Sequence, residues 1–349
     1  MASWQSKQIT LECGTTAAAQ CPVIVSASRS TDIPAFYADW FFNRLKVGYS
    51  AWTNPFNGVK SYVSYQNTRF IVFWSKNPKP LLEHLDELKE RNIGCYIQFT
   101  LNDYEAEKLE LRVPALSERI DTFRKMVDKL GKGRVIWRFD PLILTDKIGL
   151  EDVLRKVENI GNQLQGYTEK LVFSYADIAL YKKVKANLEK SHVNYQEWTA
   201  EQMEKFAIRL SALNQKWHYQ LSTCGEKIDL EPYSIQHNRC VDDDLMIRFA
   251  HQDEALMNFL GVEIKRTEDL LFIPEHSILL DDGRIAIKTK DNKDKGQRQF
   301  CGCMMSKDIG EYNTCPHLCE YCYANASKEV AVRNWEEHKN NMFGESIKG

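Results

Sequence analysis

Seven short runs of apolar residues, separated by longer segments with helical periodicity, constrain the fold of this 349-residue chain most strongly. The runs are continuous rather than alternating in polarity, which is typical of strands buried on both faces of a sheet. Strands are predicted at 23–28, 50–53, 70–74, 95–100, 135–139, 171–175 and 219–223. Helices are predicted at 39–46, 80–91, 117–130, 150–164 and 200–215. The alternation predicts an α/β fold, either a full or partial (β/α) barrel of the TIM type or a doubly wound open sheet.

Polar residues end each apolar run, and this pattern favours the barrel, because active sites form at the carboxyl ends of barrel strands. The first run also lacks a following GxGxxG, which counts against the doubly wound sheet. Asp and Asn at such positions often only cap helices and turns, but turns have no special need for cations. The candidate catalytic residues are the polar side chains at the strand ends: Arg29, Lys76, Gln98, Arg138, Asp140 and Ser174.

The strand–helix pattern breaks after about residue 250. Residues 251–290 are predicted to form strands with a turn at 281–283, and a closing helix is predicted at 324–339. We therefore expect an N-terminal segment (1–20), a barrel (21–250), an inserted hairpin (251–290) and a C-terminal part (291–349) that completes the barrel.

The composition predicts a cytoplasmic protein. The chain begins without the charged and apolar regions of a signal peptide, and no run of eighteen apolar residues could span a membrane. A net charge of -2 gives no global attraction to nucleic acid. In a reducing compartment, clustered cysteines indicate metal ligands or catalytic thiols, and five of the ten cysteines lie within 301–322.

The most specific motif is Cys315, Cys319 and Cys322, spaced C-x3-C-x2-C, with Tyr321 before the last cysteine. Thiolates at such short spacings can hold several corners of an iron–sulfur cube. Three ligands leave one iron open, and an open position distinguishes a reactive metal site from a structural one.

This C-x3-C-x-aromatic-C pattern resembles the signature of the radical S-adenosylmethionine superfamily. The resemblance implies a 4Fe–4S cluster on the three cysteines, whose open iron chelates S-adenosylmethionine. It implies reductive cleavage to a 5′-deoxyadenosyl radical that abstracts hydrogen from a substrate, an electron donor such as flavodoxin or ferredoxin, and a full or partial (β/α) barrel. Arg138 is the best-placed partner for the methionyl carboxylate, followed by Arg29 and Lys76, and Tyr321 is expected to pack against the cluster.

Most of the chain also resembles the bacterial domain of unknown function 1848 family, which has no established reaction. The resemblance lies in SASRSTDIPAFYADWFFNRL, FWSKNP, VIWRFDP, KDKGQR and CGCMMSKDIGEYNTCPHLCEYCYAN. In the radical superfamily the cysteine loop usually follows the first barrel strand, whereas here it lies near the C-terminus. A circular permutation would make the strand before the loop and the helix after it the usual first β-α unit.

Four further cysteines are predicted to form a second site for an auxiliary 4Fe–4S cluster or zinc: Cys224, Cys240, Cys301 and Cys303. The alternative is that Cys224 and Cys240 are buried, apolar thiols. Cys13, Cys21 and Cys95 follow no ligand pattern.

Two other functions remain open. A zinc- or cluster-stabilised module that binds nucleic acid or protein would use no radical chemistry. Zinc sites usually repeat a C-x2-C motif at a distance, whereas this chain has one C-x-C and one C-x3-C-x2-C. A protein that only transfers electrons would not need polar strand ends. The substrate is also open between a small molecule, a peptide and a nucleic-acid lesion, the last because C-x-Y-C-Y-A resembles the loop of spore photoproduct lyases.

Overall fold

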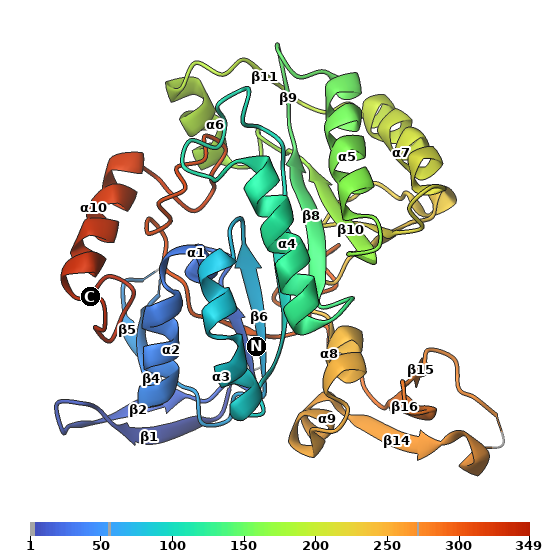
Figure 1. Cartoon of the computed structure of the whole chain (residues 1–349). Coiled ribbons are helices and arrows are strands. Elements are labelled where there is room, and N and C mark those ends of the chain that lie inside the picture. The colour runs from blue at the N-terminus through green and yellow to red at the C-terminus, as the bar shows by residue number, and fades with distance from the viewer. Residues whose placement is uncertain (1–3, 55–56, 271) are drawn as a thin grey trace.

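The computed structural model describes residues 4–54, 57–270 and 272–349, and an eight-stranded sheet lies at its centre (Figure 1). The strand order is β17-β3-β6-β7-β8-β10-β12-β13, and every neighbouring pair is parallel. The strands are β3 (Ile24–Ala27), β6 (Phe70–Ser75), β7 (Gly94–Thr100), β8 (Val135–Leu142), β10 (Lys170–Tyr175), β12 (Gln220–Thr223), β13 (Ile235–His237) and β17 (Lys307–Asp308). The predicted α/β fold with a parallel sheet is confirmed.

The sheet is open rather than closed. Among the described residues β13 and β17 are its two edges, so a full barrel is not formed. From β3 to β13 the strands nevertheless follow one another in chain order. A doubly wound sheet reverses its strand order at a switch point, and this sheet has no such reversal.

Helices cover one face of the sheet, because each buries an apolar stripe against it. Phe41, Phe123 and Phe206, from three different helices, belong to the same buried cluster as Phe73 and Phe99 of the sheet. The helices of this layer are α1 (Ile33–Phe36), α2 (Ala38–Val47), α3 (Leu85–Glu90), α4 (Leu116–Leu130), α5 (Leu150–Leu164), α6 (Lys182–Lys190) and α7 (Ala200–Asn214). The predicted helix at 80–91 is divided into a 3₁₀ turn, η1 (Lys79–Glu83), and α3.

The opposite face, which we call the inner face, is covered by a segment that leaves β13 and later returns to β17. Val72, Ile136 and Val172 of the sheet form a second buried cluster with Val241 and Met304. The segment carries α8 (Asp243–Ala250) and α9 (Glu254–Leu260), followed by a small antiparallel sheet in the order β14-β16-β15. These strands are β14 (Val262–Arg266), β15 (Ile278–Leu279) and β16 (Arg284–Lys288).

One predicted strand belongs to a different sheet. Residues 50–53 form β4 (Tyr49–Thr53), but β4 pairs antiparallel with β5 (Lys60–Ser64) and not with the parallel strands. Its sheet has the order β1-β2-β5-β4 and includes two strands from the N-terminal segment, β1 (Ser6–Thr10) and β2 (Thr16–Gln20). A further two-stranded pair joins β9 (Leu144–Thr145) to β11 (Tyr195–Gln196).

The C-terminal part of the chain packs against its N-terminal part. β17 pairs with β3, and the closing helix α10 (Lys328–Asn340) places the Trp335 ring 5.6 Å from Phe36 and 5.2 Å from Tyr37. In Figure 1, α10 lies beside the blue N-terminal elements. No helix in the described part of the chain combines the length and apolar character needed to cross a bilayer.

Candidate functional site at the carboxyl ends of the strands

Asp32 connects the cysteine loop to the ends of two strands. Its carboxylate accepts hydrogen bonds from the Ser75 hydroxyl (2.7 Å), the Lys76 N–H (2.7 Å) and the Ala35 N–H (3.0 Å). His317 Nε2, inside the loop, lies 2.8 Å from Asp32 Oδ2. Asp32 therefore both caps α1 and holds the loop through His317.

The cysteine loop lies against the segments that follow β3, β6 and β7, because His317 contacts Asp32, Tyr321 contacts Lys76 and Cys319 pairs with Glu110. Cys319 forms a β-bridge with Glu110. The sulfur of Cys322 accepts a hydrogen bond from the Asn325 N–H at 3.3 Å. Burial raises the pKa of Cys315 and outweighs the backbone at His317 and Asp32, which lowers it. Such N–H···S bonds stabilise negative charge on sulfur and tune metal–thiolate sites.

The donor set of this loop fits an iron–sulfur cluster. Burial raises the pKa of Cys315 to about 12 and raises the pKa of Cys319 well above its ordinary value, so both thiols need a bound cation to ionise. Among the described residues, no three cysteine sulfurs lie mutually within 4.8 Å. A single zinc ion with Zn–S bonds of about 2.3 Å would need closer sulfurs, so the spacing suits a larger, polynuclear group better.

Lys76 and Tyr321 are brought together beside this loop. Lys76 Nζ lies 2.7 Å from Glu110 Oε1 and 2.9 Å from the Tyr321 hydroxyl, which also contacts Glu110. Asn102 donates to the same hydroxyl at 3.0 Å. Burial opposes the charge of Lys76, but Glu110 and Cys319 outweigh it and raise the pKa of the ammonium group. The Lys76 charge is therefore retained next to the cysteine loop.

Four more of the predicted site residues form one network at the ends of β7, β8 and β10. Arg138 contacts Asp140 through Nη2, and its Nη1 donates to Gln98 Oε1 at 3.3 Å. The Ser174 hydroxyl donates to Asp140. Burial of Asp140 raises the pKa of its carboxyl group, but the neighbouring Arg138 guanidinium outweighs this effect, so that the pKa of Asp140 is lowered. Arg138 and Asp140 thus form the structural ion pair that is the alternative to ligand binding by Arg138.

Arg29 differs from Arg138 in having an unsatisfied donor. The two guanidinium groups lie over the same ring, at 5.4 Å and 5.2 Å from the centre of Trp74. The backbone N–H of Arg29 is held by Asp308 Oδ2 at 2.8 Å, but its Nη2 is buried without a hydrogen-bond partner. A buried guanidinium N–H without a partner is costly, so this atom is suited to an anionic ligand.

The other four predicted ligands also come together. Cys224 Sγ lies 3.5 Å from Cys240 Sγ, and Cys303 Sγ accepts the N–H groups of Cys240 (3.2 Å) and Val241 (3.4 Å). Cys301 is next in the row, and its thiol contact with Cys303 lowers its pKa to about 7. Cys13, Cys21 and Cys95 make no thiol contact of this kind among the described residues.

Sequence reasoning missed three acidic or amide side chains of the site. Asn102, Glu110 and Asp308 lie in loops or in a two-residue strand, without a motif to identify them. Asn102 could have been found, because it closely follows a predicted strand, as the chosen candidates do. No local signal marks Glu110 or Asp308.

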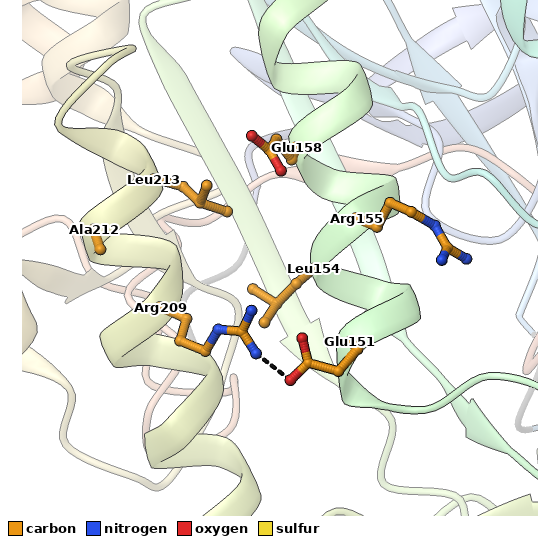
Figure 2. Close-up of a pocket in the computed structure, with 7 residues that line it drawn as sticks. All are labelled: Glu151, Leu154, Arg155, Glu158, Arg209, Ala212 and Leu213. Carbon is orange, nitrogen blue, oxygen red and sulfur yellow. Dashed lines mark hydrogen bonds and ion pairs between the residues drawn. The ribbon is translucent and has the colours of Figure 1, made fainter.

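The hollow drawn in Figure 2 lies elsewhere, between α5 and α7. It measures about 510 Å³ and is bridged by the ion pair of Arg209 and Glu151. None of the predicted site residues lines it, so it carries no functional argument here.

A comparison with family models gives one match. The model described as Domain of unknown function (DUF1848) matches residues 24–324, which include every predicted site residue. No curated protein matches the chain.

Proposed function

The chain belongs to the family described as Domain of unknown function (DUF1848), and from the residues that this member carries we propose that it is a radical S-adenosylmethionine enzyme. The observation that carries the proposal is the loop of Cys315, Cys319 and Cys322, which lies against the segments that follow three parallel strands and in which Cys322 accepts a backbone N–H···S bond. When bound and reduced, a 4Fe–4S cluster on these thiolates supplies the electron that cleaves S-adenosylmethionine and so generates an adenosyl radical.

The sheet supports the permuted form of this fold. β17 directly precedes the cysteine loop and lies next to β3, and α10 follows the loop. In space, the β17–loop–α10 unit therefore stands before β3 in an otherwise sequential row of strands. We propose that the sheet is a partial (β/α) barrel whose first unit is encoded last.

The residues around the loop have separate roles in this proposal. Arg29 binds an anionic group, such as the methionyl carboxylate, through its unpartnered Nη2. Lys76 keeps positive charge beside Cys319, and Tyr321 holds Lys76 and Glu110 in place. Asp140 and Ser174 offer oxygen atoms to the ribose or the amino group, and Arg138 orients Asp140 as a positioning residue.

The test is anaerobic reconstitution of the whole chain with Cys319→Ser as the variant and Cys95→Ala as the control. Cys95 is also a buried thiol, with 5% of its surface exposed against 8% for Cys319, but it lies outside the site. We expect the wild type and Cys95→Ala to release 5′-deoxyadenosine after dithionite reduction, and Cys319→Ser to release only background amounts. Addition of S-adenosylmethionine should also change the electron paramagnetic resonance spectrum of the reduced wild type and of Cys95→Ala.

The competing functions give different results. Zinc-loaded protein without 5′-deoxyadenosine would favour the nucleic-acid or protein-binding module and overturn the proposal. A reducible cluster that ignores S-adenosylmethionine would favour an electron-transfer protein. If the proposal holds, replacing dithionite by reduced flavodoxin or ferredoxin should support turnover.

A further inference from the structure

The row of four thiols on the inner face is not used by the proposed radical chemistry. Cys224 follows β12, Cys240 follows β13, and Cys301 and Cys303 precede β17. Cys240 and Cys303 expose only 2% and 3% of their surfaces. The chain thus gathers four thiols from three segments that are far apart in the sequence.

Polar donors surround these sulfurs as they would surround ionised thiolates. Cys240 Sγ accepts hydrogen bonds from Asn238 Nδ2 and from Arg138 Nη1, both at 3.0 Å. Cys303 Sγ accepts two backbone N–H groups, from Cys240 and Val241. Each of these two sulfurs therefore accepts two hydrogen bonds. A neutral thiol is a weak acceptor and does not need two donors, whereas the negative charge of a metal-bound thiolate is stabilised by them.

We propose that Cys224, Cys240, Cys301 and Cys303 bind an iron–sulfur cluster of their own, separate from the group on the cysteine loop. Four thiolates close the coordination of a 4Fe–4S cube, so this cluster has no open iron for S-adenosylmethionine. Arg138 offsets part of its negative charge. Because Arg138 also contacts Asp140, the second cluster lies beside the polar network at the strand ends.

The four sulfurs do not form the compact set that a single tetrahedral zinc ion requires. In a tetrahedral zinc site with bonds of about 2.3 Å, all four sulfurs are mutual neighbours. Here Cys224 and Cys240 are 3.5 Å apart, but no third sulfur lies within 4.8 Å of both. The thiols form a row along which several metal ions can be placed.

The cluster would also join the two edges of the open sheet. Met304 N–H donates to Val241 O at 3.0 Å, so the segment leaving β13 and the segment entering β17 already run side by side across the inner face. Metal–thiolate bonds between Cys240 and Cys303 would fasten these segments covalently. The sheet would then be closed by a cofactor instead of a backbone ladder.

The test removes the cysteine loop first, so that only the second site can bind metal. In the variant Cys315→Ala/Cys319→Ala/Cys322→Ala, purified and reconstituted anaerobically, we expect about four iron and four sulfide per chain. Adding Cys95→Ala, which removes a buried thiol elsewhere, should leave these contents unchanged. Adding Cys240→Ala/Cys303→Ala should bring iron and sulfide close to zero.

Three results would overturn the proposal: no metal in the loop variant, one zinc per chain in place of iron, or a Cys224–Cys240 disulfide without metal. If the five-cysteine variant does not fold, judged by circular dichroism, Cys224→Ser in the loop variant replaces it, because that side chain is half-buried. We then expect the absorption spectrum of the cluster to be lost or changed. An unchanged spectrum would show that Cys224 is not a ligand and would overturn the four-thiol site. A different result would overturn the radical-enzyme proposal. If the wild type contains no more iron per chain than the loop variant, then the cysteine loop binds no cluster.

Discussion

The ion pair of Lys76 and Glu110 allows a quantitative test of what holds the cysteine loop in place. The charged atoms are 2.7 Å apart, and the side chains are 16% and 2% exposed. At an effective dielectric constant of about 20, charges at this separation attract by about 6 kcal/mol. The loss of hydration on burial offsets most of this attraction, and measured couplings of buried pairs are accordingly smaller.

We expect Lys76→Met to lower the free energy of unfolding by about 3 kcal/mol, because it leaves Glu110 buried without its main partner. Arg119 Nη2, 3.7 Å from Glu110 Oε2, and the Tyr321 hydroxyl soften the loss. Glu110→Gln alone should also destabilise. The double variant should be less destabilised than the sum of the two, with a coupling of about 1.5–2 kcal/mol.

The assay is urea unfolding of the cluster-free chain, monitored by tryptophan fluorescence. The wild type, the two single variants and the double variant form a double-mutant cycle. The exposed pair of Lys129 and Asp86, 2.6 Å apart and 40% and 69% exposed, serves as the matched control. Its coupling should stay below about 0.5 kcal/mol. A coupling equally small for Lys76 and Glu110 would refute the reasoning and would leave Lys76 free for a ligand.

Two further predictions concern charge at the strand ends. Arg29→Met should keep the iron content but weaken S-adenosylmethionine binding at least about tenfold in a titration, since a charge-assisted hydrogen bond contributes roughly 1.5–3 kcal/mol. Equal affinity would remove Arg29 from the site. Burial, and secondarily Asp177, raises the pKa of Glu226 to about 8. Since the unfolded carboxyl ionises near pH 4.3, Glu226 should make the chain less stable as pH rises from about 4 to 8. Glu226→Gln should therefore stabilise more at pH 8 than at pH 5, by at least about 1 kcal/mol, and a pH-independent effect in urea unfolding would contradict the assignment.

The central strands could be predicted from the sequence because their character is local. The run at 135–139 is apolar except for Arg138, and all five of its residues are buried in β8. The strand at 50–53 was assigned to the wrong sheet, because an apolar run carries no information about its partner. In the structure this partner is β5, with which β4 pairs antiparallel.

The segment on the inner face was predicted in part. The strands and the turn expected within 251–290 are present as β14, β15 and β16, whereas α8, α9 and β17 were missed because their structure depends on distant contacts. β17 has two residues and is a strand only because β3 lies next to it. α8 begins inside the acidic stretch 242–244, and it packs Met246 and Ile247 against the sheet. The choice between a full and a partial barrel could not be made from the sequence for the same reason. The periodicity of a strand does not show whether it pairs with another edge strand.

The candidate site was predicted in part. The cysteine spacing and the polar strand ends pointed to side chains that the fold brings close together, because carboxyl ends of parallel strands lie at the same edge of the sheet. The sequence analysis ranked Arg138 before Arg29 as a partner for an anionic ligand. The folded chain separates them, since Arg138 has Asp140 as a counterion and Arg29 retains a buried Nη2 without a partner.

The pairing of β17 with β3 also sets the order in which this protein can mature. Ser26 on β3 donates a hydrogen bond to Asp308 on β17 across 282 residues, and the cysteine loop follows β17. On a ribosome that adds about 5–20 residues per second, β3 leaves the exit tunnel long before its edge partner exists. The cysteine loop can reach the strand ends only after β17 and every other strand of the sheet have been synthesised. A cluster on this loop would therefore be assembled after the strands that surround it have been made.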